Sequence, residues 1–217
     1  MKIVVLTCDK HGWLVPVFLH FLKKNWRDNP YKIEIVTETD PVDGTVFYSK
    51  EKSWSGRLIN YLVQCRRDKI LLTLEDYFIK SRVDSKRIRI AEDLCRDDVG
   101  CVRLNNIPNK YFQRHTTSSD IEGFREYPPD KRYSMVMQMA IFQKQFLLDV
   151  LRSGESVWQT EGKGSERLGK LKSKWRILWP ETNIVDYMSD GGLIKKGKIR
   201  LSAVQWALMD LIKCQEY

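Results

Sequence analysis

The apolar residues of the N-terminal half recur in two different patterns. Nearly continuous apolar runs lie at 2–7 (KIVVLT), 68–74 (DKILLTL) and 99–105 (VGCVRLN). Such runs are typical of strands that are buried on both faces of a parallel sheet. The stretch 31–38 (YKIEIVTE) alternates between apolar and polar residues instead, and predicts one further strand.

Between these strands, apolar residues recur at helical spacing. This spacing predicts helices over 13–26, 56–67 and 86–96. The residues suited to cap the last two helices are Ser53 or Ser55, and Asp84 or Ser85. Strands and helices that alternate in this way predict an α/β sandwich, in which helices flank a mainly parallel central sheet.

The pattern is less regular in the C-terminal half. Residues 106–132 are rich in polar and turn-forming types, and a loop this long in a compact domain is usually functional or mobile. The elements predicted beyond it are a strand at 133–142, a short helix at 144–151, a helix or broken helix at 155–171 and an amphipathic helix at 201–214. No linker or internal repeat divides the chain, so we expect residues 1–217 to form a single domain.

The composition indicates in which cellular compartment we expect the protein. The five cysteines are scattered and never spaced as C-x-x-C, so free thiols in a reducing compartment fit better than a disulfide framework or a zinc site. No apolar run approaches the roughly 18 residues that span a bilayer. The start, MKIVVLT, lacks the apolar core of a signal peptide. We therefore expect a cytoplasmic protein without a transmembrane segment.

The formal net charge of +9 bears on partners rather than on fold. A chain this basic attracts polyanions, so nucleotides, nucleic acids and peripheral contact with an anionic surface all stay open. The basic residues Lys163, Arg167, Lys170 and Lys174 follow helical spacing, and KKGK at 195–198 adds a second cluster. They form either a solvated surface or a track for phosphates.

The candidate site residues directly follow the ends of the predicted strands. Ligands of open α/β sheets bind outside the carboxyl ends of the strands, which here are followed by Thr7 to His11, Thr37 to Asp40, and Glu75 with Asp76. The loop after the first strand lacks G-x-G-x-x-G, and the chain has no G-x-x-x-x-G-K-[ST], so hydride transfer and P-loop chemistry lose their main support. Glu75 and Asp76 either end a strand harmlessly or hold a divalent metal ion beside a diphosphate.

Three segments in a fixed order resemble one family. WSGRLINYL, DKILLTLEDYFI and MAIFQKQFLLDVLRSGESVWQTEGKGSERL are similar to small bacterial and phage glycosyltransferases of the GT-A type. In that family an acidic motif at a strand end takes the place of a D-x-D sequence, and a W-x-x-E-x-x-x-S-x-R-like segment follows near the acceptor. The resemblance implies a Rossmann-like sheet whose first half, 1–104, binds a nucleotide sugar and whose second half, 105–217, faces the acceptor.

The resemblance also implies roles on the donor side. Asp76, supported by Glu75, would contact the donor diphosphate or a Mn²⁺ or Mg²⁺ ion bound to it, and Arg57 would share in neutralising charge. The residues that would line the base and ribose pocket are Thr7, Cys8, Asp9 and Thr37. Tyr77 and Phe78 stand where a second aspartate would complete a D-x-D, so metal dependence stays open.

On the acceptor side, the family-like segment consists of Trp158, Glu161, Ser165 and Arg167. In an inverting transferase a carboxylate accepts the proton of the attacking hydroxyl group, and the resemblance gives this role to Glu161. The alternative is a surface glutamate that pairs with Lys163 or Arg167. Trp158 would stack on a sugar or form a pocket wall.

The sequence leaves three functions to compare. The first is transfer of a sugar from a nucleotide diphosphate donor to an acceptor hydroxyl group, with the acceptor left open as a carbohydrate or DNA. The second has the same chemistry but a hydroxylated base in DNA as the acceptor, which the basic charge permits. The third is a nucleic-acid-binding α/β module without catalysis.

Overall fold

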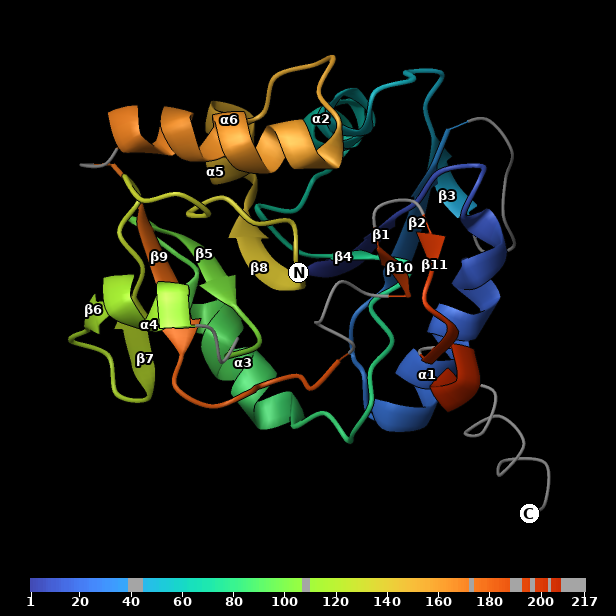
Figure 1. Ribbon diagram of the computed structural model, residues 1–217, viewed down its shortest axis with the longest axis horizontal. Coiled ribbons are helices and arrows are strands. Elements are labelled where there is room, and N and C mark those ends of the chain that lie inside the picture. Colours follow the sequence, from blue (N-terminus) through green and yellow to red (C-terminus); the bar gives the residue numbers. More distant parts are fainter. Residues whose placement is uncertain are drawn as a thin grey trace.

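In the computed structural model, nine strands join into one sheet that extends across the molecule (Figure 1). The structure describes residues 1–38, 45–106, 110–171, 174–187, 193–195, 198–202 and 204–207. The strands, in sheet order, are β3 (Thr45–Tyr48), β2 (Ile33–Thr37), β1 (Lys2–Leu6), β4 (Lys69–Leu74), β8 (Ala140–Gln143), β5 (Val99–Arg103), β9 (Arg176–Pro180), β7 (Phe124–Glu126) and β6 (Thr117–Ser118).

Helices connect most of these strands. They are the 3-10 turn η1 (Gly12–Leu14), α1 (Val15–Asn25), α2 (Trp54–Gln64), α3 (Ser85–Leu94), α4 (Lys110–His115), α5 (Lys144–Val150) and α6 (Val157–Lys170). Two further short strands, β10 (Ile194–Lys195) and β11 (Lys198–Ile199), form a separate ribbon. The predicted α/β sandwich is confirmed.

The sheet is mainly parallel, as predicted. Strands β3, β2, β1 and β4 run in one direction. Strand β8 is antiparallel to both of its neighbours, β4 and β5, so β5 runs the same way as β4. Strand β9 is parallel to β5, and β7 is antiparallel to β9. The carboxyl ends of β1, β4, β5 and β9 therefore share one edge of the sheet.

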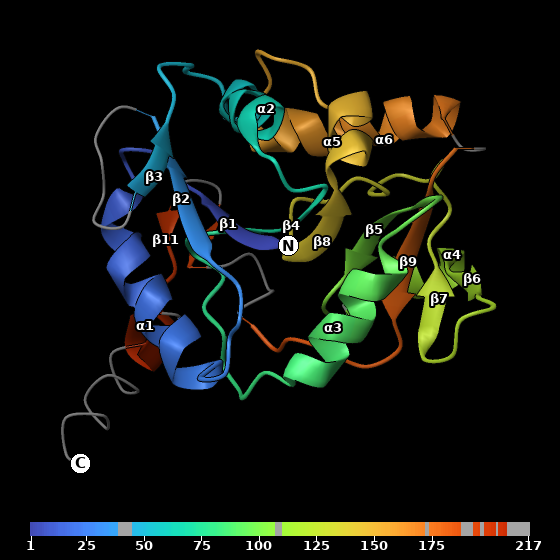
Figure 2. The same ribbon diagram turned by 180° about the vertical axis from the view of Figure 1, so that it is seen from behind.

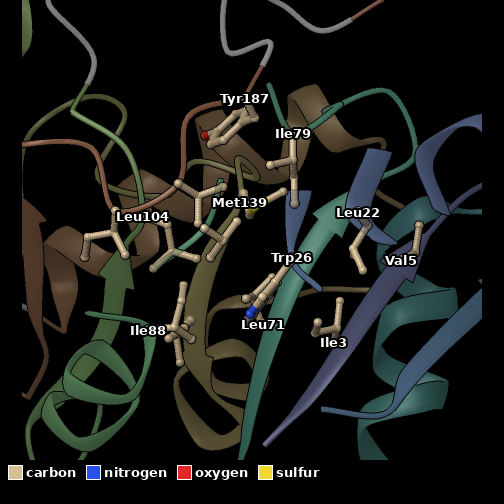
Figure 3. Packing of buried hydrophobic residues seen from close by; sticks show 14 of the residues in the cluster. Ile3, Val5, Leu22, Trp26, Leu71, Ile79, Ile88, Leu104, Met139 and Tyr187 are labelled. Atoms are coloured by element: carbon tan, nitrogen blue, oxygen red, sulfur yellow. The ribbon is translucent and has the colours of Figure 1, made fainter. Parts of the chain in front are cut away.

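Helices cover both faces of the sheet, as Figures 1 and 2 show from opposite sides. Helices α1 and α3 bury residues such as Phe18 and Ile88 against one face, where Ile3 and Val5 of β1 point. Helices α2, α5 and α6 cover the other face, where Val4 of β1 points. Figure 3 shows part of the first apolar cluster, to which Trp26, Leu71 and Ile3 belong. Alternate residues of a strand thus serve opposite cores.

Side-chain caps fix where the helices begin. Of the two serines that could cap α2, Ser53 does so, because its Oγ accepts a hydrogen bond from the Gly56 amide. Asp84 caps α3 in the same way. Helix α6 begins with a capping box between Ser156 and Gln159. The favourable start of α6 explains why this helix is continuous, where the sequence left a broken helix open.

The predicted strand at 133–142 is wrong over most of its length, since β8 covers only Ala140–Gln143. Two side chains of α6 capture the backbone amides that would otherwise join a ladder. The Met135 amide donates to Ser165 Oγ (3.1 Å), and the Met137 amide donates to Glu161 Oε1 (2.8 Å). An amide that donates to a side chain is not available to a neighbouring strand.

The last described residues only partly test the predicted C-terminal helix. Residues 201–202 and 204–207 are helical, and the Trp206 ring stacks on Phe21 with centroids 4.9 Å apart. The predicted helix beyond residue 207 lies outside the described residues. In the part of the chain that the structure describes, no helix has both the length and the apolar character to cross a membrane.

Candidate functional site

A cavity of about 250 Å³ opens at the carboxyl ends of β1 and β4. Its walls also include the first turns of α2 and α6 and the start of β10. It is lined by Leu6, Thr7, Cys8, His11, Trp54, Arg57, Leu74, Glu75, Asp76, Val157, Trp158 and Ile194. The sequence singled out six of these for the site: Thr7, Cys8, Arg57, Glu75, Asp76 and Trp158. The fold brings these six together from four separate elements.

Glu75 and Asp76 form the acidic side of this cavity, and both are buried. The Asp76 Oδ2 atom accepts a hydrogen bond from the Ile194 amide (3.2 Å), and the Leu193 amide donates to the Asp76 carbonyl oxygen. Glu75 Oε1 lies 3.3 Å from His11 Nδ1. Asp76 thus anchors the start of the β10 ribbon, while Glu75 holds the histidine.

The protonation of these groups follows from their burial. Burial and the neighbouring Glu75 charge raise the pKa of Asp76 to about 7. The hydrogen bond to Glu75 raises the pKa of His11, so the imidazole is more readily charged than usual. Burial raises the pKa of the Cys8 thiol, so it stays protonated at neutral pH. The cavity therefore contains a buried carboxyl group, that of Asp76, whose charged form a nearby cation would stabilise.

Arg57 supplies the buried positive charge of the cavity. Its Nη1 donates to Glu38 Oε1 (2.6 Å) and to the carbonyl oxygen of Lys52 (3.0 Å). Glu38 in turn accepts from the Asp9 amide through Oε2 (3.1 Å). The guanidinium is thus fixed between the end of β2 and the start of α2, and Glu38 offsets its charge.

Two predicted donor residues lie beside the cavity rather than in its lining. Asp9 is exposed next to Cys8, and its backbone is tied to Glu38. Thr37 is fully buried at the end of β2, and its Oγ1 has no hydrogen-bond partner among the described residues. Their roles on the donor side stay predictions.

Trp54 and Trp158 form the aromatic wall of the cavity. Trp158 occupies the first turn of α6 and remains 66% exposed, which is unusual for so large an apolar side chain. An indole in the wall of a cavity offers a flat apolar surface to a ring-shaped ligand.

Glu161 follows Trp158 by about one helical turn on α6 and is not part of the cavity lining. Its Oε1 accepts a hydrogen bond from the Met137 amide, and burial raises the pKa of its carboxyl group against the charge of Arg103. Burial first, and then the charges of Tyr187, Asp76 and Glu161, raise the pKa of Tyr77.

The surface ion pairs that the sequence offered as an alternative for Glu161 do not form. Within the part of the chain that the structure describes, Glu161 pairs with neither Lys163 nor Arg167, and the partner of its carboxylate is a backbone amide. The carboxyl group thus points inward rather than to the basic surface of α6.

Ser165 and Arg167 make contacts within the protein. Ser165 Oγ donates to the Glu161 carbonyl oxygen (2.7 Å) and accepts from the Met135 amide. Arg167 forms a two-pronged ion pair with Glu155, at 2.9 and 2.6 Å. Neither residue lines the cavity, and both hold α6 against its surroundings. Their predicted acceptor roles are not tested by these contacts.

The basic residues of α6 do not form one free track. Arg167 is engaged by Glu155, and Lys174, which lies beyond the end of the helix, pairs with Asp149 at 2.6 Å. Among the basic residues of this predicted face, Lys163 and Lys170 are exposed.

Comparison with known proteins bears on the fold. No protein-family model and no curated protein matches the chain. Among solved structures, the mannosyltransferase PcManGT from Pyrobaculum calidifontis, in complex with GDP-Man and Mn²⁺, matches 90% of this chain and 57% of its own at 14% identity and a TM-score of 0.58. TarS 1–349 from S. aureus matches 86% and 59%, at 14% identity and a TM-score of 0.53. The fold is GT-A.

The chain spans less than two thirds of the length of either of these proteins. The same TarS fragment is also known in complex with UDP-GlcNAc. At 14% identity the likeness is one of fold.

In this GT-A fold, the acidic side of the cavity fits a divalent cation shared with a ligand. Carboxylate oxygens are the donors that Mg²⁺ and Mn²⁺ prefer, and the raised pKa of Asp76 marks a buried negative charge that lacks full compensation. Among the described residues, no group of three or more His, Cys, Asp or Glu side chains is arranged to hold a metal ion.

His11 and Glu38 lie within the stretches after β1 and β2 that the strand-end rule marked from the sequence, but neither was assigned a role there. In the structure, His11 is fixed by Glu75, and Glu38 holds Arg57. Trp54, which forms a wall of the cavity, was not singled out as a site residue, because its position depends on how α2 packs on the sheet.

Proposed function

We propose that this chain is a glycosyltransferase that moves a sugar from a nucleotide diphosphate donor to an acceptor hydroxyl group. The observation that carries the proposal is the cavity at the ends of β1 and β4, where Arg57, Glu75, Asp76 and Trp158 meet in a GT-A fold. The likeness to PcManGT and TarS, which are known in complex with nucleotide sugars, supports the same class of donor.

The donor would lie with its diphosphate at Asp76 and its base and ribose towards the end of β2. Thr7 and Cys8 line that part of the cavity, and Asp9 and Thr37 lie next to it. Trp158 would cover the sugar or the base. His11, held by Glu75, and Arg57 place positive charge near the phosphates.

A divalent cation would be held by Asp76 and Glu75, where it would neutralise charge on the leaving diphosphate. The residues of the chain contribute the remaining steps. The acceptor oxygen attacks the anomeric carbon, Glu161 accepts the hydroxyl proton, and the bond from the anomeric carbon to the diphosphate oxygen breaks. The raised pKa of Glu161 suits a carboxylate that gains a proton during the reaction.

The first test is donor binding and turnover. The full chain is incubated with a panel of UDP, GDP, CDP and dTDP sugars, with and without Mn²⁺, and thermal stability and slow donor hydrolysis are measured. A donor that binds raises the unfolding temperature. Asp76→Asn is expected to abolish hydrolysis of that donor. The matched control Asp93→Asn, at an exposed position on α3, is expected to behave as the wild type.

Failure would be clear. If no nucleotide sugar raises the unfolding temperature or is hydrolysed, or if Asp76→Asn hydrolyses its donor at the wild-type rate, the assignment is wrong. DNA binding across a salt series separates the nucleic-acid alternatives, because phosphate contacts weaken steeply with salt. Salt-sensitive DNA binding without binding of any nucleotide sugar would favour a non-catalytic module.

A further inference from the structure

A second hollow lies on the same edge of the sheet, at the carboxyl ends of β5 and β9. It has a volume of about 280 Å³ and is lined by Asn106, Gln113, Thr116, Arg125, Trp179, Pro180 and Glu181. Figure 1 shows that α4, β6 and β7, which supply part of its wall, lie at the end of the sheet remote from β1 and α1. The donor, bound at the ends of β1 and β4, needs none of these residues.

The base of this hollow is rigid. Trp179 is 2% exposed, and its Nε1 donates to Asn106 Oδ1 (3.3 Å). The Arg103 guanidinium lies over the indole, 4.4 Å from the ring centroid. Asn106 is fixed in turn, because its Nδ2 donates to the Glu181 carbonyl oxygen (2.5 Å). A wall held in this way is already shaped before a ligand arrives.

The rim of the hollow carries polar groups that are free to bind a ligand. In the described part of the chain, the Gln113 amide and the Glu181 carboxylate have no side-chain hydrogen-bond partner. Arg125 uses Nη2 for the Thr116 carbonyl oxygen (3.2 Å) and keeps further N–H groups. Donors and acceptors occur side by side, which suits hydroxyl groups, since each hydroxyl both donates and accepts.

The charge of the lining distinguishes between classes of ligand. Arg125 and Glu181 offset each other, and the remaining polar groups of the hollow are neutral. A groove for nucleic acid needs an excess of positive charge along the phosphates. A neutral hollow with amides and one charge of each sign fits a carbohydrate instead, because the hydroxyl groups of a sugar both donate and accept hydrogen bonds.

The distance between the two hollows sets the length of the ligand. Three inter-strand steps separate β4 from β9 in the sheet order, and at about 4.8 Å per step the hollows lie roughly 14 Å apart along the edge. One sugar ring at the reaction centre is too short to reach the second hollow. A chain of several sugars could occupy both.

We propose that the acceptor is an oligosaccharide or polysaccharide, whose end lies at Glu161 and Asp76 and whose preceding units occupy the hollow of Gln113, Arg125, Trp179 and Glu181. This proposal rests on the proposed glycosyltransferase function and names its acceptor class. Binding energy from remote units then holds the terminal hydroxyl group in place for attack.

The test uses the full chain and a variant that fills the hollow. Gln113 is exposed on α4, so Gln113→Trp adds bulk without disturbing the core. Binding is measured by titration calorimetry for glucose and N-acetylglucosamine oligomers, from the monosaccharide to the hexasaccharide. In the wild type, affinity for at least one series is expected to rise with length. In Gln113→Trp the longer oligomers are expected to lose about tenfold in affinity, while the monosaccharide is unaffected.

A second variant removes polar groups from the hollow instead of adding bulk to it. Gln113→Ala combined with Glu181→Ala deletes the amide and the carboxylate of the rim. This double variant is expected to lower the affinity for the longer oligomers in the same way. The control Arg89→Ala, at an exposed position on α3, leaves the hollow untouched and is expected to have no effect. Donor hydrolysis without acceptor is expected to be the same in every variant.

Several results would overturn the proposal. Affinity that is independent of oligomer length, wild-type affinity of Gln113→Trp for long oligomers, or the absence of binding by both series would each do so. DNA binding that Gln113→Trp abolishes would show that the hollow serves a nucleic acid. Loss of the underlying transferase function would differ from all of these: length-dependent oligosaccharide binding would persist, but no nucleotide sugar would be bound or hydrolysed.

Discussion

At the scale of single residues, Asp76 is buried beside a second acidic residue, Glu75. It also accepts a hydrogen bond from the backbone at the start of the β10 ribbon. Its pKa of about 7 lies above the ordinary value of 3.8, so the folded protein binds this proton more tightly than the unfolded chain. Stability is therefore lost as the pH rises from about 4 to about 7, and the full cost is present above that range.

Asp76→Asn removes this cost and keeps an oxygen for the Ile194 amide. In a buffer with a metal chelator, we expect the variant to exceed the wild type in free energy of unfolding by roughly 1–3 kcal/mol above pH 7. The difference is expected to vanish at low pH. Urea denaturation across this pH range measures it, and equal stabilities above pH 7 would contradict the raised pKa.

The same residue predicts the effect of metal. If Asp76 and Glu75 hold a cation, Mn²⁺ should raise the unfolding temperature of the wild type at neutral pH, because a bound ion stabilises only the folded state. It should leave Asp76→Asn unchanged, and chelation should reverse the effect. An equal rise in both proteins would place any bound metal elsewhere.

Two roles of Glu161 can be separated: its carboxyl group accepts a hydrogen bond from the Met137 amide, and it is the proposed base of the reaction. Glu161→Gln keeps an acceptor for that amide, so we expect stability within about 0.5 kcal/mol of the wild type. Activity is expected to fall by about a hundredfold or more, because an amide cannot accept the acceptor proton. Glu161→Ala should also destabilise the fold by about 1–3 kcal/mol, since a buried amide loses its partner.

The outcome of these two variants is read from steady-state rates and urea denaturation. Full activity of Glu161→Gln would remove the base role and leave Glu161 as a support for residues 135–137. Loss of activity in Glu161→Ala alone would point to the same conclusion.

The acidic residues of the cavity could be predicted from the sequence because the end of the buried strand before them could be predicted. Glu75 and Asp76 follow an apolar run that could hardly be anything but a buried strand, so their position on the sheet edge followed from sequence. The capture of Met135 and Met137 by side chains of α6 did not. Both contacts join segments far apart in the chain, and no local pattern records them.

At the scale of elements, α6 packs closely at one glycine and freely at another. A Cβ at Gly164 would lie 3.0 Å from Met135 Cγ and 3.1 Å from Val150 Cγ1, whereas a Cβ at Gly162 would meet nothing within 4 Å. Gly164→Ala is therefore expected to destabilise the protein by about 1–2 kcal/mol through overpacking. Gly162→Ala should stabilise it by about 0.5–1 kcal/mol through helix propensity.

Thermal or urea denaturation of the two variants compares them directly, and each is a matched control for the other. If both glycine variants were stabilised, α6 would not pack against Met135 and Val150 as closely as the structure indicates. Reduced activity of Gly164→Ala with unchanged Gly162→Ala would further tie this packing to the position of Glu161.

The elements with strong periodicity were the predictable ones. β1, β4 and β5 contain nearly continuous apolar runs, and helices α2 and α3 between them begin at capping residues that the sequence pattern indicates. β9 was missed because RILWP begins with Arg176 and ends in proline, and the partners that offset this arginine, Asp120 and Glu126, are distant in sequence. The four-residue β3 was missed because it is too short to show a period.

At the scale of the whole molecule, one sheet runs through both of the halves that the sequence predicted, 1–104 and 105–217. β8 comes from the second half and pairs with β4 and β5 of the first half. We therefore expect the halves to unfold together. Tryptophan fluorescence and far-UV circular dichroism should report one coincident transition, and two separated transitions would contradict this coupling.

The antiparallel strand β8 also has a consequence for how the protein is made. Until residues 140–143 leave the ribosome, the apolar strand β4 has a partner on one side only, and its other side presents unpaired backbone groups. Such an edge readily pairs with other chains. The N-terminal half must therefore wait for a strand made much later, and chaperone binding during synthesis would protect it in that interval.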